Sequence, residues 1–181
     1  MRKTDLPIDR DQLRALSSPI RLEIYSSLSS DGPATARELA VRMGGDEMTL
    51  YYHLRLLARK GLISSEARPT ATKPEQVFSA KRRFVVNLDL GNERNLAEVK
   101  RNIDVLFKTT SKDCRASAEA FRNEFHAGSV VGRQAVRLAP EVFRELSDKL
   151  RALSVWAQEN AAEDGDRYLF TFAAVRLAPR G

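Results

Sequence analysis

The segment 46–60 constrains this chain more than any other part of the sequence. It lies between a Gly-Gly pair and a single glycine, and its leucines Leu50, Leu54 and Leu57 stand at i, i+4 and i+7. That spacing places the three side chains on one face of a helix. We expect Asp46 to cap this helix. A helix that buries one face must present the opposite face to solvent or to a partner.

Three shorter helices are predicted before this segment. Pro19 opens the second of them with Ser18 as its cap, because proline is tolerated in the first turn of a helix. The third starts at Thr35, where Thr35-Ala-Arg-Glu38 forms a capping box. The glycine pair then ends it, since glycine accepts the left-handed conformation of many helix exits.

Two short strands, 62–68 and 76–80, are predicted after the leucine helix, around a loop that holds two prolines. Two helices joined by a glycine turn, followed by a hairpin, describe a winged helix-turn-helix. Such a unit presents its second helix to the major groove of DNA. We also expect the positive amino end and free amides of that helix to favour phosphate.

The distribution of charge agrees with a polyanionic partner. The chain carries 30 basic and 24 acidic residues, a net charge of +6. The window 51–83 contains eight basic residues and two acidic ones, so it accounts for the whole excess. A basic cluster on an otherwise neutral chain is typical of a nucleic-acid surface, although a solvated charged face is the common alternative.

Three segments together resemble a known family. Segment 13–25 holds a leucine helix and a Pro-x-Arg start, 35–40 reads Thr-Ala-Arg-Glu-Leu-Ala, and 49–63 holds Tyr-x-His-Leu-x-x-Leu followed by Gly-Leu-Ile. In this order and spacing they resemble the ArsR-like winged-helix transcriptional regulators, over roughly residues 13–84. The resemblance implies a dimer that binds double-stranded DNA.

The resemblance also implies which residues touch DNA. The positions that match the family's base-reading face are Glu47, Met48, Thr49, Tyr51, Tyr52 and Arg55. The hairpin is the wing of such a domain. The residues assigned to phosphate contacts and to the wing are Arg59, Lys60, Arg68, Thr70, Thr72 and Lys73, and the set is completed by Thr35 and His53. An acidic residue at position 47 is unusual on such a face, but a carboxylate accepts from the amino group of cytosine.

A stretch without glycine or proline, 93–125, predicts one long helix. A helix of this length normally buries its apolar stripe against a partner, so we expect self-association. Cys114 lies among small residues and is most simply part of the apolar face. The expected dimerisation residues are Leu96, Val99, Ile103, Leu106, Phe121 and Phe125.

The C-terminal part is expected to be strand, helix, strand, with strands at 134–138 and 168–177 and a helix that starts at Pro140. The strands could pair with each other or with a second subunit. This order resembles an extension found on some ArsR-like regulators, which implies dimerisation and an effector site. A pocket for a small effector would use Trp156, Tyr168, Phe170 and Phe172, although aromatic residues at such spacing are usually core.

The expected fold is mainly α with a small β component, in the α+β class. We expect a winged helix-turn-helix at 1–90, a long helix at 91–127 and a strand-helix-strand subdomain at 128–181. No apolar run is long enough to cross a bilayer and no secretory signal is visible, so a cytoplasmic protein is expected.

No catalytic set, metal site or cofactor motif is visible in the sequence. The cysteine pair of the family's metal sensors is absent from 38–43, and Glu119 with His126 supplies too few ligands. The chain is therefore expected not to be an enzyme. The alternative to a DNA-binding regulator is a winged-helix module that binds proteins and not DNA.

Overall fold

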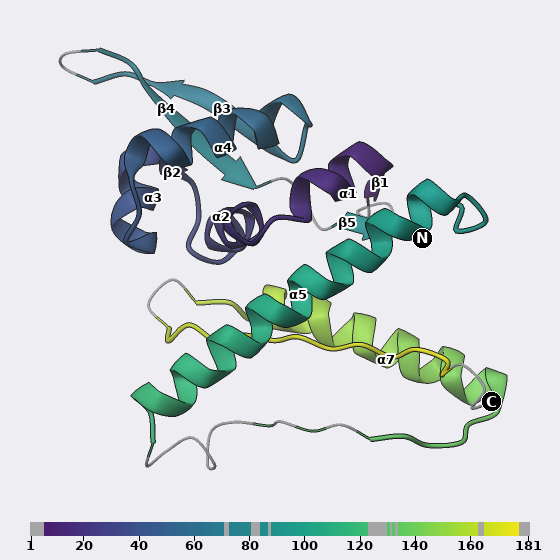
Figure 1. Ribbon diagram of the computed structural model, residues 1–181. Coiled ribbons are helices and arrows are strands. Elements are labelled where there is room, and N and C mark those ends of the chain that lie inside the picture. Colours follow the sequence, from purple (N-terminus) through teal and green to yellow (C-terminus); the bar gives the residue numbers. More distant parts are fainter. Residues whose placement is uncertain are drawn as a thin grey trace. The chain divides into compact units, whose positions relative to one another are not determined.

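The computed structural model describes residues 6–70, 73–80, 84–86, 88–122, 130, 132, 134–162 and 165–177, with the backbone alone for 6 and 84–86. The chain divides into two compact units, Met1–Ser111 and Lys112–Gly181. In chain order the elements of Figure 1 are β1 (Leu6–Ile8), α1 (Arg10–Leu16), α2 (Pro19–Ser30), β2 (Ala34–Thr35), α3 (Ala36–Met43), α4 (Glu47–Arg59), β3 (Ile63–Arg68), β4 (Glu75–Ala80), β5 (Phe84–Val86), α5 (Glu93–Ala120) and α7 (Pro140–Glu159).

The ends of the helices in the first unit follow their local sequence. At the start of α3, the Glu38 amide donates to the Thr35 hydroxyl at 3.1 Å and the Thr35 amide donates to the Glu38 carboxylate at 2.7 Å. Gly44 ends α3 in the left-handed conformation, with φ of 64°. Both predictions are confirmed. Ser18 occupies the N-cap of α2, but its side chain makes no capping hydrogen bond.

The hairpin of β3 and β4 is antiparallel, and its register joins Ile63 to Ala80 and Arg68 to Glu75. The two predicted strands are therefore confirmed. A third strand, β2, pairs with the other edge of β4 and was not expected, because two residues are too short for a periodic signal. β1 and β5 form a separate parallel pair.

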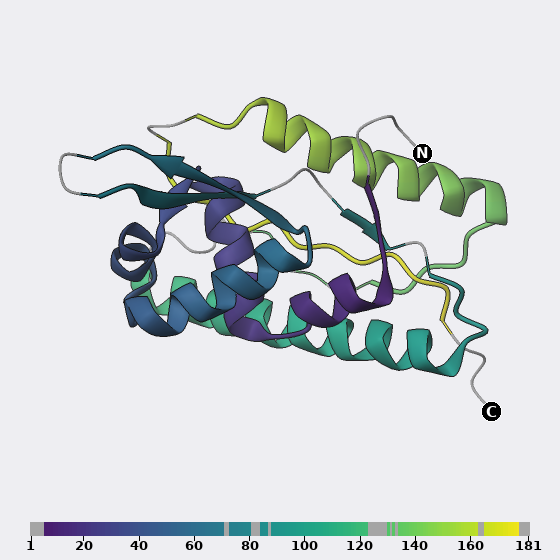
Figure 2. The ribbon, with the colours of Figure 1, turned by 90° about the horizontal axis from the view of Figure 1, so that it is seen from above.

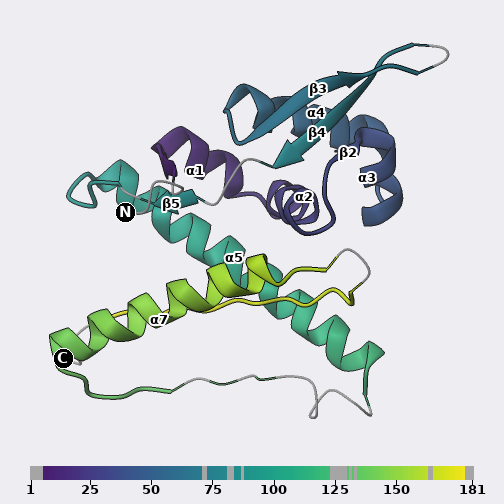
Figure 3. The same cartoon turned by 180° about the vertical axis from the view of Figure 1, so that it is seen from behind.

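A single apolar core holds the first unit together. It is built from α1–α4 and from the inner faces of β3 and β4, where Ile63 and Phe78 are buried. Figure 2 shows the helices gathered beside the hairpin, and Figure 3 shows α4 lying along it. The leucines of α4 belong to this core, as the spacing predicted.

α5 is one helix of 28 residues that starts in the first unit and ends in the second. Its first half is fixed to the winged-helix core at two positions. Val99 packs against the core cluster, and the carboxylate of buried Glu98 lies 3.5 Å from Nε of Arg14 on α1. The remaining Glu98 oxygen, Oε2, is buried and has no hydrogen-bond partner among the residues that the structure describes.

In the second unit the predicted helix is confirmed as α7, but the two flanking strands are not formed. Residues 134–139 and 165–177 carry no strand pairing. A strand needs backbone hydrogen bonds to a neighbouring strand, and alternation of side chains alone does not provide one.

The α+β class is confirmed, with predominantly helical structure and a small antiparallel sheet. The division of the chain at 90–91 and 127–128 stays a prediction. The boundary between the two compact units lies inside α5, after Ser111.

The buried leucines of α4 give a direct test of the fold. Leu54 is fully buried, so Leu54→Ala is expected to lower the free energy of unfolding by about 2–5 kcal/mol through lost burial and a cavity. Val41→Ala, on the exposed side of α3, is the control and should change it by less than about 0.5 kcal/mol. Urea denaturation of both variants measures this, and equal effects would contradict the placement of α4.

Candidate nucleic-acid interface

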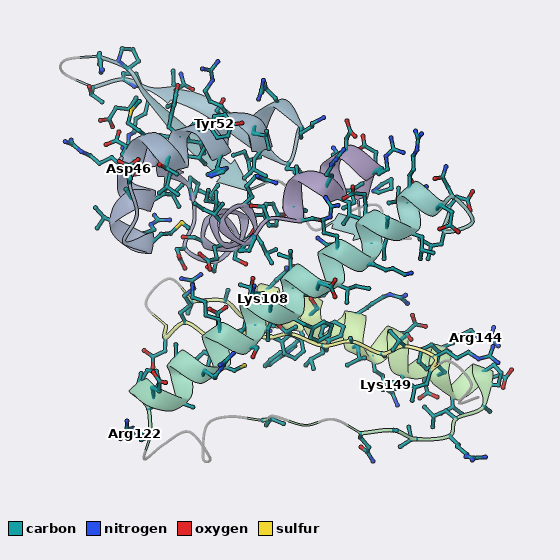
Figure 4. All side chains as sticks on the ribbon, viewed as in Figure 1. Asp46, Tyr52, Lys108, Arg122, Arg144 and Lys149 are labelled. Atoms are coloured by element: carbon teal, nitrogen blue, oxygen red, sulfur yellow. The ribbon has the colours of Figure 1, made fainter. Side chains whose placement is uncertain are left out.

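The outer face of α4 is exposed. Because Leu50, Leu54 and Leu57 point into the core, the opposite side of the helix faces solvent. Met48 is 77% exposed and Tyr52 is 61% exposed, which is unusual for large apolar and aromatic side chains. Figure 4 labels Tyr52 on this face.

Most of the predicted DNA-binding residues lie at the surface. Thr35 is buried, His53 and Lys60 are half-buried, and Thr72 lies outside the described residues. The exposed ones are Glu47, Met48, Thr49, Tyr51, Tyr52, Arg55, Arg59, Arg68, Thr70 and Lys73.

Two arginines on α4, Arg55 and Arg59, lie at the surface. Neither Arg55 nor Arg59 has an ion-pair partner among the residues that the structure describes. Both line a hollow of about 250 Å³ between α4 and the hairpin. Its floor includes buried Phe78, and the ring of Tyr51 meets Phe78 edge-on at 6.3 Å. Ser65 and Gln76 of the hairpin complete the polar rim.

The amino end of α4 is less suited to phosphate than the sequence suggested. The Thr49 amide donates to the Asp46 carboxylate at 2.7 Å, so this amide is already occupied. Hydrogen bonding from Thr49, through its side chain first and its backbone second, lowers the pKa of Asp46. Glu47 adds a second acidic residue in the same turn. Two carboxylates here repel phosphate, and the contacts with a polyanion must come from further along the helix.

Arg68 of the hairpin is held by two carboxylates. Its guanidinium donates to Glu38 at 3.0 Å and to Glu75 at 3.2 Å. These hydrogen bonds, Glu38 first and Glu75 second, raise the pKa of Arg68. Glu38 is also the carboxylate that caps α3, so one side chain joins the wing to the first helix of the helix-turn-helix. Arg68 therefore positions the hairpin and adds little free charge to its surface.

The end of the hairpin presents Lys73 to solvent. The Thr70 hydroxyl donates to the Lys73 carbonyl at 2.6 Å and accepts from the Lys73 amide at 3.3 Å. These two hydrogen bonds join residue 70 to residue 73. The basic residues Lys81, Arg82 and Arg83 of the sequence lie outside the described residues.

The flank of α4 that faces α1 and α2 has a structural role. Lys60 forms an ion pair with Asp11 at 2.8 Å. The Nδ1 atom of His53 is buried, and no described residue forms a hydrogen bond with it. Burial first, and the charge of Arg21 second, lower the pKa of His53, so its ring is neutral near pH 7.

Sequence reasoning missed Arg21 as a member of this surface. Its Nε donates to the backbone carbonyl of Ala15, and its charge interacts with Tyr52 and His53 of α4. Arg21 is half-buried, so part of the guanidinium is accessible beside the exposed ring of Tyr52. The available signal was the Pro-x-Arg pattern at the start of α2.

Comparison with known families agrees with this geometry. Residues 16–66 match the family described as a helix-turn-helix domain. The match covers α2, α3, α4 and the first part of β3. A domain of this kind indicates a DNA-binding regulator. No curated protein matches the chain.

The predicted dimerisation residues do not form one exposed face. Val99 packs on the core of its own unit, Leu96 and Leu106 are half-buried, and Ile103 and Phe121 are exposed. Phe125 lies outside the described residues.

The aromatic residues expected to line an effector pocket are largely exposed. Trp156, Tyr168 and Phe170 are open to solvent, and the rings of Phe170 and Phe172 are 5.1 Å apart. Within the described ranges, no group of three or more metal-ligating side chains lies together. No described helix is both long and apolar enough to span a membrane.

The link between Glu38 and Arg68 makes stability depend on pH. Hydrogen bonding lowers the pKa of Glu38, mainly through the Thr35 amide and then through Arg68. A lowered pKa means that this stabilisation is present above about pH 4.5 and is lost as pH falls through the folded-state pKa. Glu38→Gln keeps a capping amide oxygen but removes the charge.

We expect Glu38→Gln to lower the free energy of unfolding at pH 7 by about 0.5–1 kcal/mol, since the pair is partly exposed. Between pH 5 and pH 3 the variant should lose less stability than the natural chain. The control is Glu66→Gln on the same hairpin, because Glu66 has no ion-pair partner within the described part of the chain. Identical pH profiles for the natural chain and Glu38→Gln would contradict the assigned link.

Proposed function

We propose that the protein is a homodimeric, sequence-specific DNA-binding transcriptional regulator of the ArsR-like kind, acting on DNA in the cytoplasm. The observation that carries the proposal is the outer face of α4, which is exposed, aromatic and basic at once. Met48, Tyr51 and Tyr52 are exposed together on one helix, and a group of exposed apolar side chains is typical of a surface that a partner covers.

In this proposal α4 lies in the major groove. A groove about 12 Å wide admits one α-helix. Glu47, Met48, Thr49, Tyr51 and Tyr52 are placed to read base edges from the first turns, where side chains of a recognition helix reach deepest. The acidic first turn then faces bases and not phosphates. Its repulsion of phosphate would in this case help to orient α4 in the groove.

The hollow beside α4 is where we place the DNA backbone. When a helix occupies one groove and the wing reaches toward the next, the strand between the two grooves must cross the surface that separates them. On this protein that surface is the hollow lined by Arg55 and Arg59. Charge neutralisation there would supply most of the affinity, with base contacts supplying the specificity. Lys73, with Thr70 and Thr72, would extend the contact along the wing.

The proposal includes a homodimer, because one recognition helix reads only a short DNA segment. Two recognition helices about 34 Å apart would bind the two halves of an inverted repeat. We propose α5 as part of the interface, through the exposed residues Ile103 and Phe121. A small effector bound at the C-terminal aromatic residues would regulate the dimer.

A protein-interaction module without DNA binding is the second candidate. Two observations favour it: the carboxylates at the amino end of α4, and the neutralisation of Arg68 by Glu38 and Glu75. Arg55 and Arg59 make no ion pair with the described residues, which favours DNA, since a neutral partner would leave both charges buried and uncompensated.

Selection of duplexes from a random library, followed by anisotropy titrations at several salt concentrations, tests the proposal. We expect a preferred sequence and an affinity that falls steeply with salt. Arg55→Ala and Arg59→Ala should each weaken binding about tenfold and reduce the salt slope by about one. Arg94→Ala, an exposed arginine at the start of α5, should change neither quantity.

Charge reversal separates the two candidates. Arg55→Glu combined with Lys73→Glu should abolish DNA binding if α4 and the wing contact the duplex. Absence of any sequence preference in the natural chain, at every salt concentration, would refute the regulator and leave the protein-interaction module.

A further inference from the structure

The outer stripe of α4 is the line of side chains that points most directly away from the core. At about 100° per residue, four side chains fall within an arc of about 60° opposite the buried leucines: Met48, Tyr52, Arg55 and Arg59. Met48 is the most amino-terminal of the four and is 77% exposed. Glu47 falls outside this arc, so the residue at the front of the stripe is apolar and not acidic.

The chemistry of the outer stripe changes along the helix. It begins with a thioether at Met48, continues with a phenol ring at Tyr52 and ends with two guanidinium groups. At a rise of about 1.5 Å per residue, Met48 lies about 10 Å from Arg55 and about 16 Å from Arg59 along the helix axis. The two ends of the stripe therefore suit different parts of a duplex.

The surroundings of Met48 are unfavourable for phosphate. The two residues before it, Asp46 and Glu47, both carry exposed carboxylates. The Asp46 carboxylate accepts a hydrogen bond from the Thr49 amide at 2.7 Å, so this negative charge is fixed beside Met48 as part of the helix cap. Figure 4 labels Asp46 and Tyr52. A DNA backbone at this turn would meet two negative charges, whereas the edges of base pairs carry no net charge.

The side chain of a methionine limits what it can recognise on a base pair. It has no hydrogen-bond donor, and its sulfur is only a weak acceptor. Met48 is therefore poorly suited to the donors and acceptors by which most bases are distinguished. The apolar group that the major groove offers is the C5 methyl of thymine. An unbranched, polarisable thioether adapts well to such a small apolar surface.

We propose that Met48 is a specificity-determining residue, and that it selects thymine by contact with the C5 methyl group in the major groove. The inference rests on the proposed function, because α4 must lie in the groove. It goes further by naming the base that one side chain reads. Arg55 and Arg59, at the far end of the outer stripe, remain for the phosphates.

Replacement of thymine by uracil tests this contact, because it removes the C5 methyl and leaves the hydrogen-bonding groups unchanged. In the duplex that the natural chain selects, each thymine is replaced singly, and the affinity is measured by anisotropy at a fixed salt concentration. At one position of each half-site we expect uracil to weaken binding about fourfold, as for the loss of one buried methyl group. The same replacement should have no measurable effect on the affinity of Met48→Ala.

Two further variants distinguish methyl recognition from a general effect of substitution. Met48→Leu keeps an apolar side chain of similar volume and should retain the dependence on the thymine methyl. Val41→Ala removes an exposed apolar side chain from α3 and should leave the ratio of thymine to uracil affinity unchanged. Each result is a ratio of two affinities of one protein sample, so a smaller folded fraction does not alter it.

The outcomes separate this inference from the proposed function. Sequence-specific binding in which no uracil replacement depends on residue 48, or a selected half-site without thymine, would overturn the inference and leave the regulator standing. Absence of any preference among duplexes would overturn both, and the exposed Met48 would then belong to a surface for a protein partner.

Discussion

The burial of three leucines on one side of α4 is the interaction on which the rest of this protein depends. Leu50, Leu54 and Leu57 join side chains of α1–α3 and of the hairpin in one core. Burial of that much apolar surface fixes the rotation of α4 about its own axis. Once the rotation is fixed, the opposite side of α4 faces solvent or a partner. This side carries Tyr52, Arg55 and Arg59.

The second constraint is the position of the hairpin relative to α3 and α4. Two links set it: the pairing of β2 with β4, and the contact of Arg68 with Glu38. The Glu38 carboxylate takes part in both the α3 cap and the wing contact, so helix start and wing orientation are not independent.

The two units differ in how much apolar surface their described residues bury. The first unit contains its own core and extends it onto the start of α5 through Val99. In the second unit α7 is an amphipathic helix, and none of its described residues is buried.

The sequence alone determined the local structure of this protein: the capping box at Thr35, the glycine stop at Gly44, the Asp46 cap and the leucine spacing of α4. These features depend on residues within a few positions of one another, so their physics is contained in a short window. It could not determine that Arg68 is neutralised, that Arg21 lies beside Tyr52, or that Val99 faces its own core. Most of those contacts join residues far apart in the sequence, such as Glu38 and Arg68, that only folding brings together. Glu75 is seven positions from Arg68, and the register of the hairpin brings the two side chains together. The two strands predicted on either side of α7 are not formed for the same reason. A strand requires hydrogen bonds to a neighbouring strand, and the alternation of its own side chains does not provide them.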